Sequence, residues 1–213
     1  MMDALDHITA TLALTMGLAW ASGINLYATL LTLGFLANSG NINLPPDLQI
    51  VANPLVMGAA GIMYFIEFFA DKTPGVDTGW DAIHTFIRIP AGAMLAAGAV
   101  GDLNPAVEIA AALLGGSLAA GSHATKAGSR VLINTSPEPF SNWVASVSED
   151  IAVVGGVWAS INHPVIFLVG LVIFIILMIW VLPRIWVSVK KVFRFISAWF
   201  RKADNPPDYN LPK

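Results

Sequence analysis

Residues 165–182 read VIFLVGLVIFIILMIWVL and contain no charged side chain. A helix of this length extends about 27 Å at 1.5 Å per residue, which is close to the ~30 Å hydrocarbon core of a bilayer. The stretch therefore predicts a transmembrane helix. Because only one glycine interrupts its apolar side chains, we expect much of its surface to face lipid.

The composition of the whole chain extends this prediction. Of 213 residues, 56% are hydrophobic and only 12% are charged, and the mean hydropathy is +0.69. A soluble domain carries about 25% charged residues, so a water-soluble globule is excluded. The absence of cysteine excludes disulfides, thiolate metal sites and a cysteine nucleophile. The net charge of −3 excludes a broad basic surface, so no nucleic-acid partner is expected.

Apolar stretches long enough to cross a bilayer recur along residues 1–184, separated by short loops rich in Asn, Gly and Pro. They cover residues 8–37, 51–70, 80–101, 105–124, 139–161 and 164–183. We expect the first stretch to remain as a span, because Asp3 and Asp6 stand where a signal peptide has basic residues. The sequence thus predicts an all-α polytopic membrane protein with a bundle of six transmembrane helices.

Lysine and arginine near the ends of spans are retained in the cytoplasm, so their positions predict orientation. The loops without such residues are 38–50, 102–104 and 162–163. Basic residues mark the alternate loops, at Lys72, Lys126 and Arg130, and the C-terminal tail. Six spans in a bacterial inner membrane with both termini cytoplasmic satisfy this alternation.

Three of the spans open with a similar helix start, because Asn can cap a helix and Pro suits its first turn. The starts are Asn53-Pro54, Asn104-Pro105 and Asn162-His163-Pro164. The repeated start suggests a two-helix unit that occurs twice, over about 53–103 and 104–161. A duplicated unit often places a binding site at the interface between its copies.

The segment after Pro183 alternates apolar and basic side chains. Residues 185–202 therefore predict an amphipathic interfacial helix, and we expect the basic stretch Arg184 to Lys202 to attract anionic lipid headgroups. Residues 203–213 are expected to form a disordered tail.

Charges that lie deep in a predicted span carry the most information, because an unpaired charge there costs several kcal/mol. Arg88, Glu149 and Asp150 are expected at similar depths, which predicts an ion pair between Arg88 and one of the two acids. Such a pair can be purely structural. One arginine neutralises only one carboxylate, however, so the second would be protonated, hydrated or bound to a cation, and we favour Glu149 for that role.

Asp81, His84 and Arg88 lie on one face of a helix, so this face is expected to point into the bundle. Further polar residues near the cytoplasmic ends of the spans predict a mixed-charge vestibule, made of Asp71, Lys72, Asp77, His123, Lys126 and Arg130. For Lys72 and Lys126 the alternative is snorkelling at the membrane surface, and for His84 it is ordinary packing. Asp81 and His84 could be two metal ligands, but no acidic or histidine pair completes a set, so no metal is expected.

The first stretch is too long for a straight crossing, and Ser22-Gly23 interrupts it, followed by Asn25. A broken helix here would expose backbone groups beside the polar core and make Asn25 a candidate ligand. The alternative is that Gly23 and Gly17 only allow neighbouring helices to approach closely.

The strings ADKTPGVD at 70–77 and HATKAGSR at 123–130, together with Glu149 and Asp150, resemble an uncharacterised bacterial integral-membrane family known as domain of unknown function 4126. The resemblance covers roughly residues 10–185. It implies a multi-spanning membrane protein and supports the polar positions above, but it implies no substrate.

The sequence as a whole favours a small-solute or ion transporter or channel with a charged intramembrane site, acting as a homo-oligomer without a cofactor. A scaffold or partner subunit whose charges are structural is the alternative. A lipid-modifying enzyme that uses Asp81 and His84 as acid and base is the third interpretation, but no nucleophile stands out, so no catalytic residue is assigned.

Overall fold

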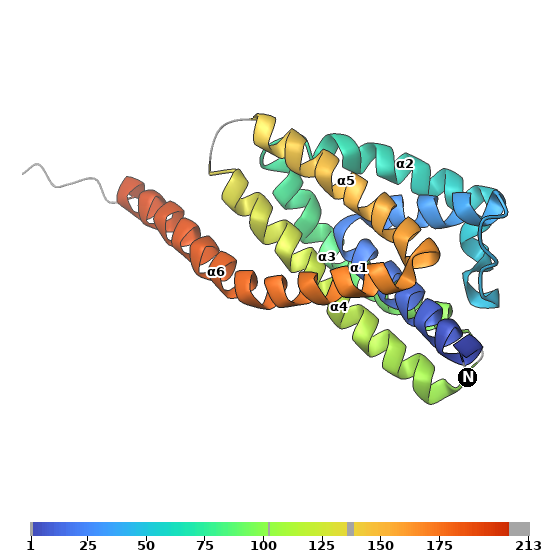
Figure 1. Ribbon diagram of the computed structural model, residues 1–213. Coiled ribbons are helices and arrows are strands. Elements are labelled where there is room, and N and C mark those ends of the chain that lie inside the picture. The colour runs from blue at the N-terminus through green and yellow to red at the C-terminus, as the bar shows by residue number, and fades with distance from the viewer. Residues whose placement is uncertain (1, 102, 136–138, 205–213) are drawn as a thin grey trace, which may run out of the picture.

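The computed structural model describes residues 2–101, 103–135 and 139–204, and within these residues it contains helices and no strand. The helices are α1 (Met2–Asn38), the 3-10 helix η1 (Pro46–Ala52), α2 (Pro54–Ala70), α3 (Val76–Val100), α4 (Pro105–Ile133), α5 (Pro139–Asn162) and α6 (Pro164–Asp204). Figure 1 shows them as one bundle from which the end of α6 projects. The all-α prediction is confirmed.

Several helices have the length and composition needed to cross a bilayer. Five described helices meet this requirement, and a sixth meets it if η1 and α2, which are bent by 62° to each other, count as one span. Large apolar side chains cover the outside of the bundle, and Leu55 and Phe86 are each 83% exposed. A soluble fold would bury such side chains, so this is the surface of a multi-pass membrane protein.

Two of the predicted helix starts, at Asn53 and Asn104, are confirmed by their caps. The side chain of Asn53 accepts a hydrogen bond from the backbone N–H of Leu55 at 2.9 Å, and Asn104 accepts one from Ala106 at 2.8 Å. Each cap satisfies one of the backbone donors that a helix start leaves free, which fixes where α2 and α4 begin.

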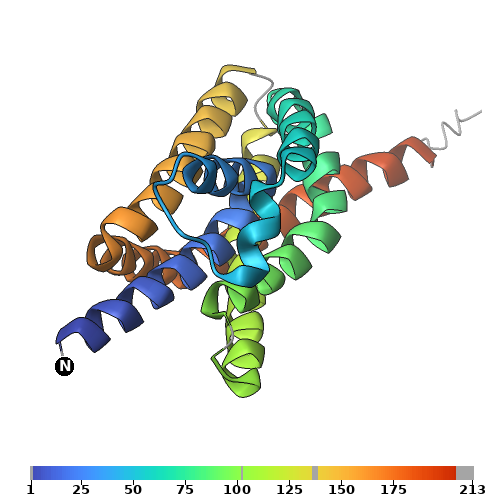
Figure 2. The same ribbon diagram turned by 90° about the vertical axis from the view of Figure 1, so that its right-hand side faces the viewer.

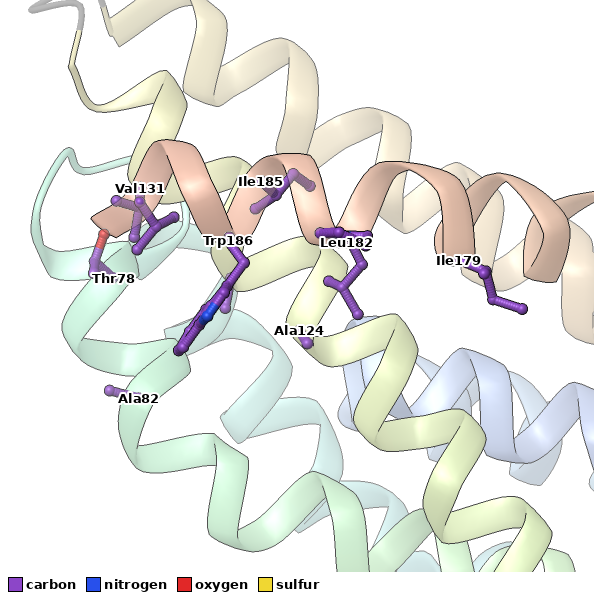
Figure 3. Close-up of a pocket in the computed structure, with 12 residues that line it drawn as sticks. Thr78, Ala82, Ala124, Val131, Ile179, Leu182, Ile185 and Trp186 are labelled. Atoms are coloured by element: carbon purple, nitrogen blue, oxygen red, sulfur yellow. The ribbon is translucent and has the colours of Figure 1, made fainter. Parts of the chain in front are cut away.

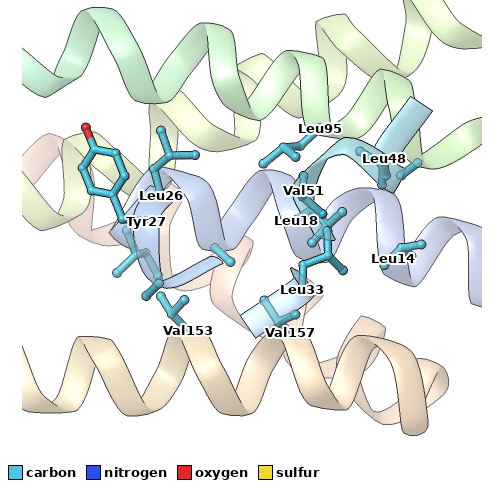
Figure 4. Packing of buried hydrophobic residues seen from close by; sticks show 14 of the residues in the cluster. Leu14, Leu18, Leu26, Tyr27, Leu33, Leu48, Val51, Leu95, Val153 and Val157 are labelled. Carbon is cyan, nitrogen blue, oxygen red and sulfur yellow. The ribbon is translucent and has the colours of Figure 1, made fainter. Parts of the chain in front are cut away.

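Helix α1 turns back on itself at Asn25, whose backbone is not helical (φ −146°, ψ 98°). Residues on both sides of the break lie against the same part of α5. Trp20 contacts Gly156 before the break, and Leu36 lies in one hollow with Trp158 after it. Figure 4 likewise places Tyr27 at one end of the core, with Leu14 and Leu33 both toward the other. The first helix is therefore a helical hairpin with its apex near Asn25.

The hairpin decides where the chain starts in the bundle. Its start and its end lie at the same end of the bundle, together with the turns that precede α2, α4 and α6 (Figures 1 and 2). The end of α6 projects from the opposite end of the bundle (Figure 1). The start of α1 and the end of α6 thus lie at opposite ends of the bundle, whereas one straight crossing by α1 would bring them to the same end. The side of the membrane on which each terminus lies stays a prediction.

The main apolar core lies between the two arms of α1 and the helices that enclose them. Leu18 and Leu33, one from each arm, are fully buried against Val157 of α5, with Val51 of η1 and Leu95 of α3 in the same cluster (Figure 4). This core holds the hairpin in place, so the apex near Asn25 has a fixed position inside the bundle.

Helix α6 continues through Pro183 without ending, so the predicted segment 185–202 is helical but is joined to the last span. Ala203 and Asp204, which were expected in the tail, belong to the same helix. The rest of the predicted tail, 205–213, lies outside the described residues.

Glycine allows the first arm of α1 to touch α4. A Cβ atom on Gly23 would overlap Ser122 Oγ and the backbone oxygen of Ala119, and one on Gly17 would lie 2.7 Å from Ser160 Cβ. The close-packing interpretation of these glycines therefore holds, and the chain break follows two residues later.

We expect Gly23→Ala to destabilise the protein by about 1–3 kcal/mol, because the added methyl group overpacks the contact with α4. Gly58→Ala is the matched control, since Gly58 also lies inside a helix but has nothing within 4 Å of its would-be Cβ. Thermal unfolding in detergent should show a loss for the first variant and no loss for the second. Equal melting temperatures would contradict the close approach.

Candidate functional site

Seven charged side chains form one connected set of ion pairs in the interior, which we call the charged network. It consists of Glu67, Asp71, Asp81, Arg88, Lys126, Arg130 and Glu149. Six of the residues are no more than 4% exposed, and the Glu149 side chain is 20% exposed. Burial at this level demands neutralisation, because an unpaired charge in a poorly solvated site is costly.

Lys126 is the centre of the charged network. Its Nζ lies 2.7 Å from Asp71, 3.4 Å from Glu67, 3.5 Å from Glu149 and 3.8 Å from Asp81. One ammonium group therefore contacts all four carboxylates of the network. The residue does not snorkel to the membrane surface, and the sequence-based alternative of an ordinary interface lysine is wrong.

Arg88 neutralises acids of α2 and α3. Its guanidinium donates to Glu67 at 2.6 Å and to Asp81 at 3.0 Å, and it lies 3.1 Å from Nδ1 of His123. The predicted ion pair of Arg88 with Glu149 or Asp150 is wrong. The predicted pairing rested on equal depth in the membrane, but the guanidinium of Arg88 is already paired with Glu67 and Asp81.

Arg130 takes the partner that was predicted for Arg88. It donates to Glu149 at 2.7 Å and to the backbone oxygens of Asp71 and Asn142, each at 3.1 Å. The guanidinium thus joins α4 to α5 and to the end of α2. Glu149 is consequently a paired acid, and its predicted role as the unneutralised one passes to Asp150.

The break in α1 meets the charged network directly. In an unbroken helix the N–H of Ala28 would bond to the oxygen of Ile24, but here it donates to Oδ1 of Asn25 at 3.0 Å. Asn25 thereby caps the second arm of α1. The freed oxygen of Ile24 accepts a hydrogen bond from Lys126 at 3.2 Å. The Asn25 amide donates to Asp150 at 3.0 Å. Asn25, the predicted candidate ligand, therefore lies at the apex of α1.

Asp150 differs from the acids of the charged network, since it makes no ion pair with any residue that the structure describes. Its carboxylate is bound by Asn25 and also contacts Tyr64 of α2. The side chain is half-buried. It is therefore less neutralised by its neighbours than the acids of the charged network are.

Lys72 closes the seam between α2 and α5. Its Nζ donates to the oxygen of Phe68 at 3.0 Å and to Ser146 Oγ at 3.1 Å, and it lies 2.9 Å from the centroid of the Phe68 ring and 5.1 Å from that of Trp143. Burial lowers the pKa of the Lys72 ammonium, and the carboxylate of Asp150 opposes this effect. This lysine also does not snorkel.

Other predicted site residues lie beside the charged network without joining its ion pairs. Both ring nitrogens of His84 are engaged, one 3.0 Å from the Tyr27 hydroxyl and one 2.9 Å from the Trp80 oxygen, which fits a packing histidine. Asp77 accepts from Asn134 at 2.8 Å and ties the start of α3 to the end of α4. Among the described residues no group of three or more His, Asp or Glu side chains could hold a metal ion.

Sequence reasoning missed Glu67, which contacts both Arg88 and Lys126. It is the only charged residue in the stretch 51–70, and it precedes Asp71 by four positions. That spacing places both acids on one face of a helix. The position of a single acid inside an apolar span could therefore have identified Glu67 as a site residue from the sequence.

The acids of the charged network outnumber its cations by four to three. Three of these carboxylates leave one buried oxygen without a hydrogen-bond partner among the described residues, namely Oε2 of Glu67, Oδ1 of Asp71 and Oδ2 of Asp81. A buried excess carboxylate takes up a proton or a cation more readily than a paired one does. The arrangement can thus take up and release a proton.

Arg88→Ala should destabilise the protein by about 3–5 kcal/mol, because it leaves two buried carboxylates without their guanidinium. Arg184→Ala, which removes an exposed arginine, is the matched control. Thermal unfolding of the two variants in the same detergent measures the difference. If Arg88→Ala unfolds no earlier than Arg184→Ala, the ion pairs of Arg88 do not stabilise the fold.

No curated protein and no solved structure matches the chain. The family model described as a domain of unknown function, DUF4126, matches residues 12–184, a range that includes the apex of the hairpin, the charged network and the start of the basic segment of α6. The chain belongs to this family, DUF4126.

Proposed function

We propose that the protein transports protons or small cations across the membrane, alone or coupled to a small solute, through the charged network and the apex of α1. The observation that carries this proposal is the contact of Lys126 with four carboxylates and with the Ile24 oxygen that the break in α1 sets free. One side chain thus links the titratable acids to the helical hairpin.

The charge balance supports a proton or cation as the transported species. A purely structural cluster needs only enough acid to match its bases, whereas this one buries an additional carboxylate and leaves Asp150 beside it without an ion pair to any residue that the structure describes. Protonation or cation binding relieves that excess. Glu149 is the least buried member of the network, since its side chain is 20% exposed.

The hairpin supports a transport path because non-helical backbone at membrane depth is tolerated only beside protein or water. Half-helices that meet at mid-depth commonly form the ion and substrate sites of transporters. Here the end of the first arm provides a carbonyl oxygen, and the start of the second arm provides the Asn25 amide that binds Asp150.

A non-transporting scaffold is the second candidate. The near-complete burial of the charged network favours it, because charges that are 0–4% exposed can hold helices in register without passing anything. The two proposals differ in what the replacement of an acid by its amide does. Replacing a structural acid lowers the stability of the protein, whereas replacing a transport acid lowers the flux.

The orientation that fits the basic residues places the ends of α2, α4 and α6 in the cytoplasm of a bacterial inner membrane. These ends carry Lys72, Arg130 and the basic residues of α6. The start of α1 then lies on the outer side. Its acidic residues Asp3 and Asp6, with no Lys or Arg nearby, fit that side.

Flux measured in proteoliposomes tests the transport proposal. With a pH-sensitive dye inside and a potential imposed across the membrane, the wild type should move protons, or do so when Na⁺ or K⁺ is added outside. Asp150→Asn and Glu149→Gln should each lower this flux by about tenfold or more, because an amide cannot exchange a proton.

Glu108→Gln is the matched control, since Glu108 is an exposed acid in the first turn of α4 and lies outside the charged network. It should transport as the wild type does. No flux above that of empty liposomes for the wild type, together with a loss of stability in Glu149→Gln, would favour the scaffold instead.

Labelling of single cysteines tests the orientation, because the natural chain contains no cysteine. We expect a membrane-impermeant maleimide to reach Ala4→Cys and Asn41→Cys from outside intact cells. Thr73→Cys and Thr135→Cys should react only after permeabilisation. These four positions are all exposed. Labelling of Ala4→Cys on the same side as Thr135→Cys would contradict the hairpin.

A further inference from the structure

An apolar groove of about 780 Å³ runs between α6 and the ends of α3 and α4 that lie near the charged network. Its walls come from Thr78 and Ala82 of α3, from small residues of α4 and from α6 between Ile179 and Val189 (Figure 3). The volume lies within the range of about 300–1,000 Å³ that small-molecule sites occupy. The lining offers almost no polar atom, so only an apolar group fits it.

Helix packing explains why the groove exists. α6 touches α4 at Gly128, where a Cβ atom would overlap the side chain of Ile185, but it does not pack along α3. A wedge between α3 and α6 is therefore left open above small α4 residues such as Ala124 and Ala127. Figure 3 shows the indole of Trp186 projecting from α6 into this wedge.

The groove has a basic end. A second hollow of about 500 Å³ shares Trp186 and Val189 with it and is further lined by Lys190, Phe193 and Arg194. The ammonium of Lys190 lies 5.1 Å from the centroid of the Trp186 ring. An elongated apolar site thus continues directly into two cationic side chains.

We infer that this groove binds one anionic phospholipid of the surrounding bilayer, with an acyl chain between α3 and α6 and the phosphate between Lys190 and Arg194. The inference does not depend on the proposed transport. Charge complementarity favours an anionic lipid over a zwitterionic one. The apolar lining favours a ligand with an acyl chain over a soluble anion such as free phosphate. The bound chain would fill the wedge that α3 and α6 leave open.

Native mass spectrometry of the protein from mixed phosphatidylglycerol and phosphatidylcholine micelles tests the preference for an anionic headgroup. The wild type should retain one phosphatidylglycerol molecule in preference to phosphatidylcholine. The double variant Lys190→Ala and Arg194→Ala should retain it about tenfold less, because both charges that face the phosphate are removed. Lys191→Ala, an exposed lysine on the same helix that lines neither hollow, is the control and should retain the lipid.

Filling the groove tests whether an acyl chain binds there. Ala124→Phe places a ring in the groove and should lower retention as strongly as the double variant, whereas Ala110→Phe, at an exposed position of α4 outside the groove, should not. Equal retention of the two lipids, or equal losses in Lys191→Ala and the double variant, would overturn the inference in favour of general surface attraction. A change from dimer to monomer in Ala124→Phe without loss of lipid would overturn it in favour of a second copy of the chain.

Discussion

The fold depends on neutralising buried charge around the ammonium of Lys126. Four carboxylates on α2, α3, α5 and the turn after α2 converge on this one group, and Arg88 and Arg130 supply the remaining positive charge. Each acid would be costly alone at this depth, so the helices that carry them are bound to one another through α4. The apolar contacts of the bundle cannot impose this arrangement by themselves, because lipid competes for every apolar face.

The same constraint explains why a broken helix is stable in the interior. Asn25 leaves the helical conformation, which frees the Ile24 oxygen and the N–H of Ala28. The two groups are satisfied by Lys126 and by the Asn25 side chain, so the break leaves neither of these backbone groups unpaired. The apolar arms of α1 then pack on η1, α3 and α5 and keep the apex beside the network. Charge and backbone geometry therefore support each other at one point.

Sequence reasoning predicted the helical membrane fold, the Asn-Pro helix starts and most of the polar residues, because these depend on local composition and spacing. It did not predict the reversal at Asn25. Basic residues orient a chain only where they occur, and none precedes Lys72, so the position of the first helix was unconstrained. Sequence reasoning also predicted the wrong partner for Arg88, because it used only the depth of the residues in the membrane. Depth places side chains in one layer, but rotation about each helix axis decides which of them meet, and that is set by tertiary packing.

The two family strings, ADKTPGVD and HATKAGSR, converge on one end of the bundle. The first turns the chain from α2 into α3 and provides Asp71, and the second lies near the end of α4 and provides Lys126 and Arg130. A shift of α4 along its axis would move both cations relative to the acids and would pull Lys126 from the Ile24 oxygen at the hairpin apex. Conversely, protonation of a carboxylate would weaken the hold on Lys126 and loosen the apex. The hairpin and the acids are thus linked through a single side chain, and in the proposed transport this is the point at which proton uptake by an acid would act on the backbone.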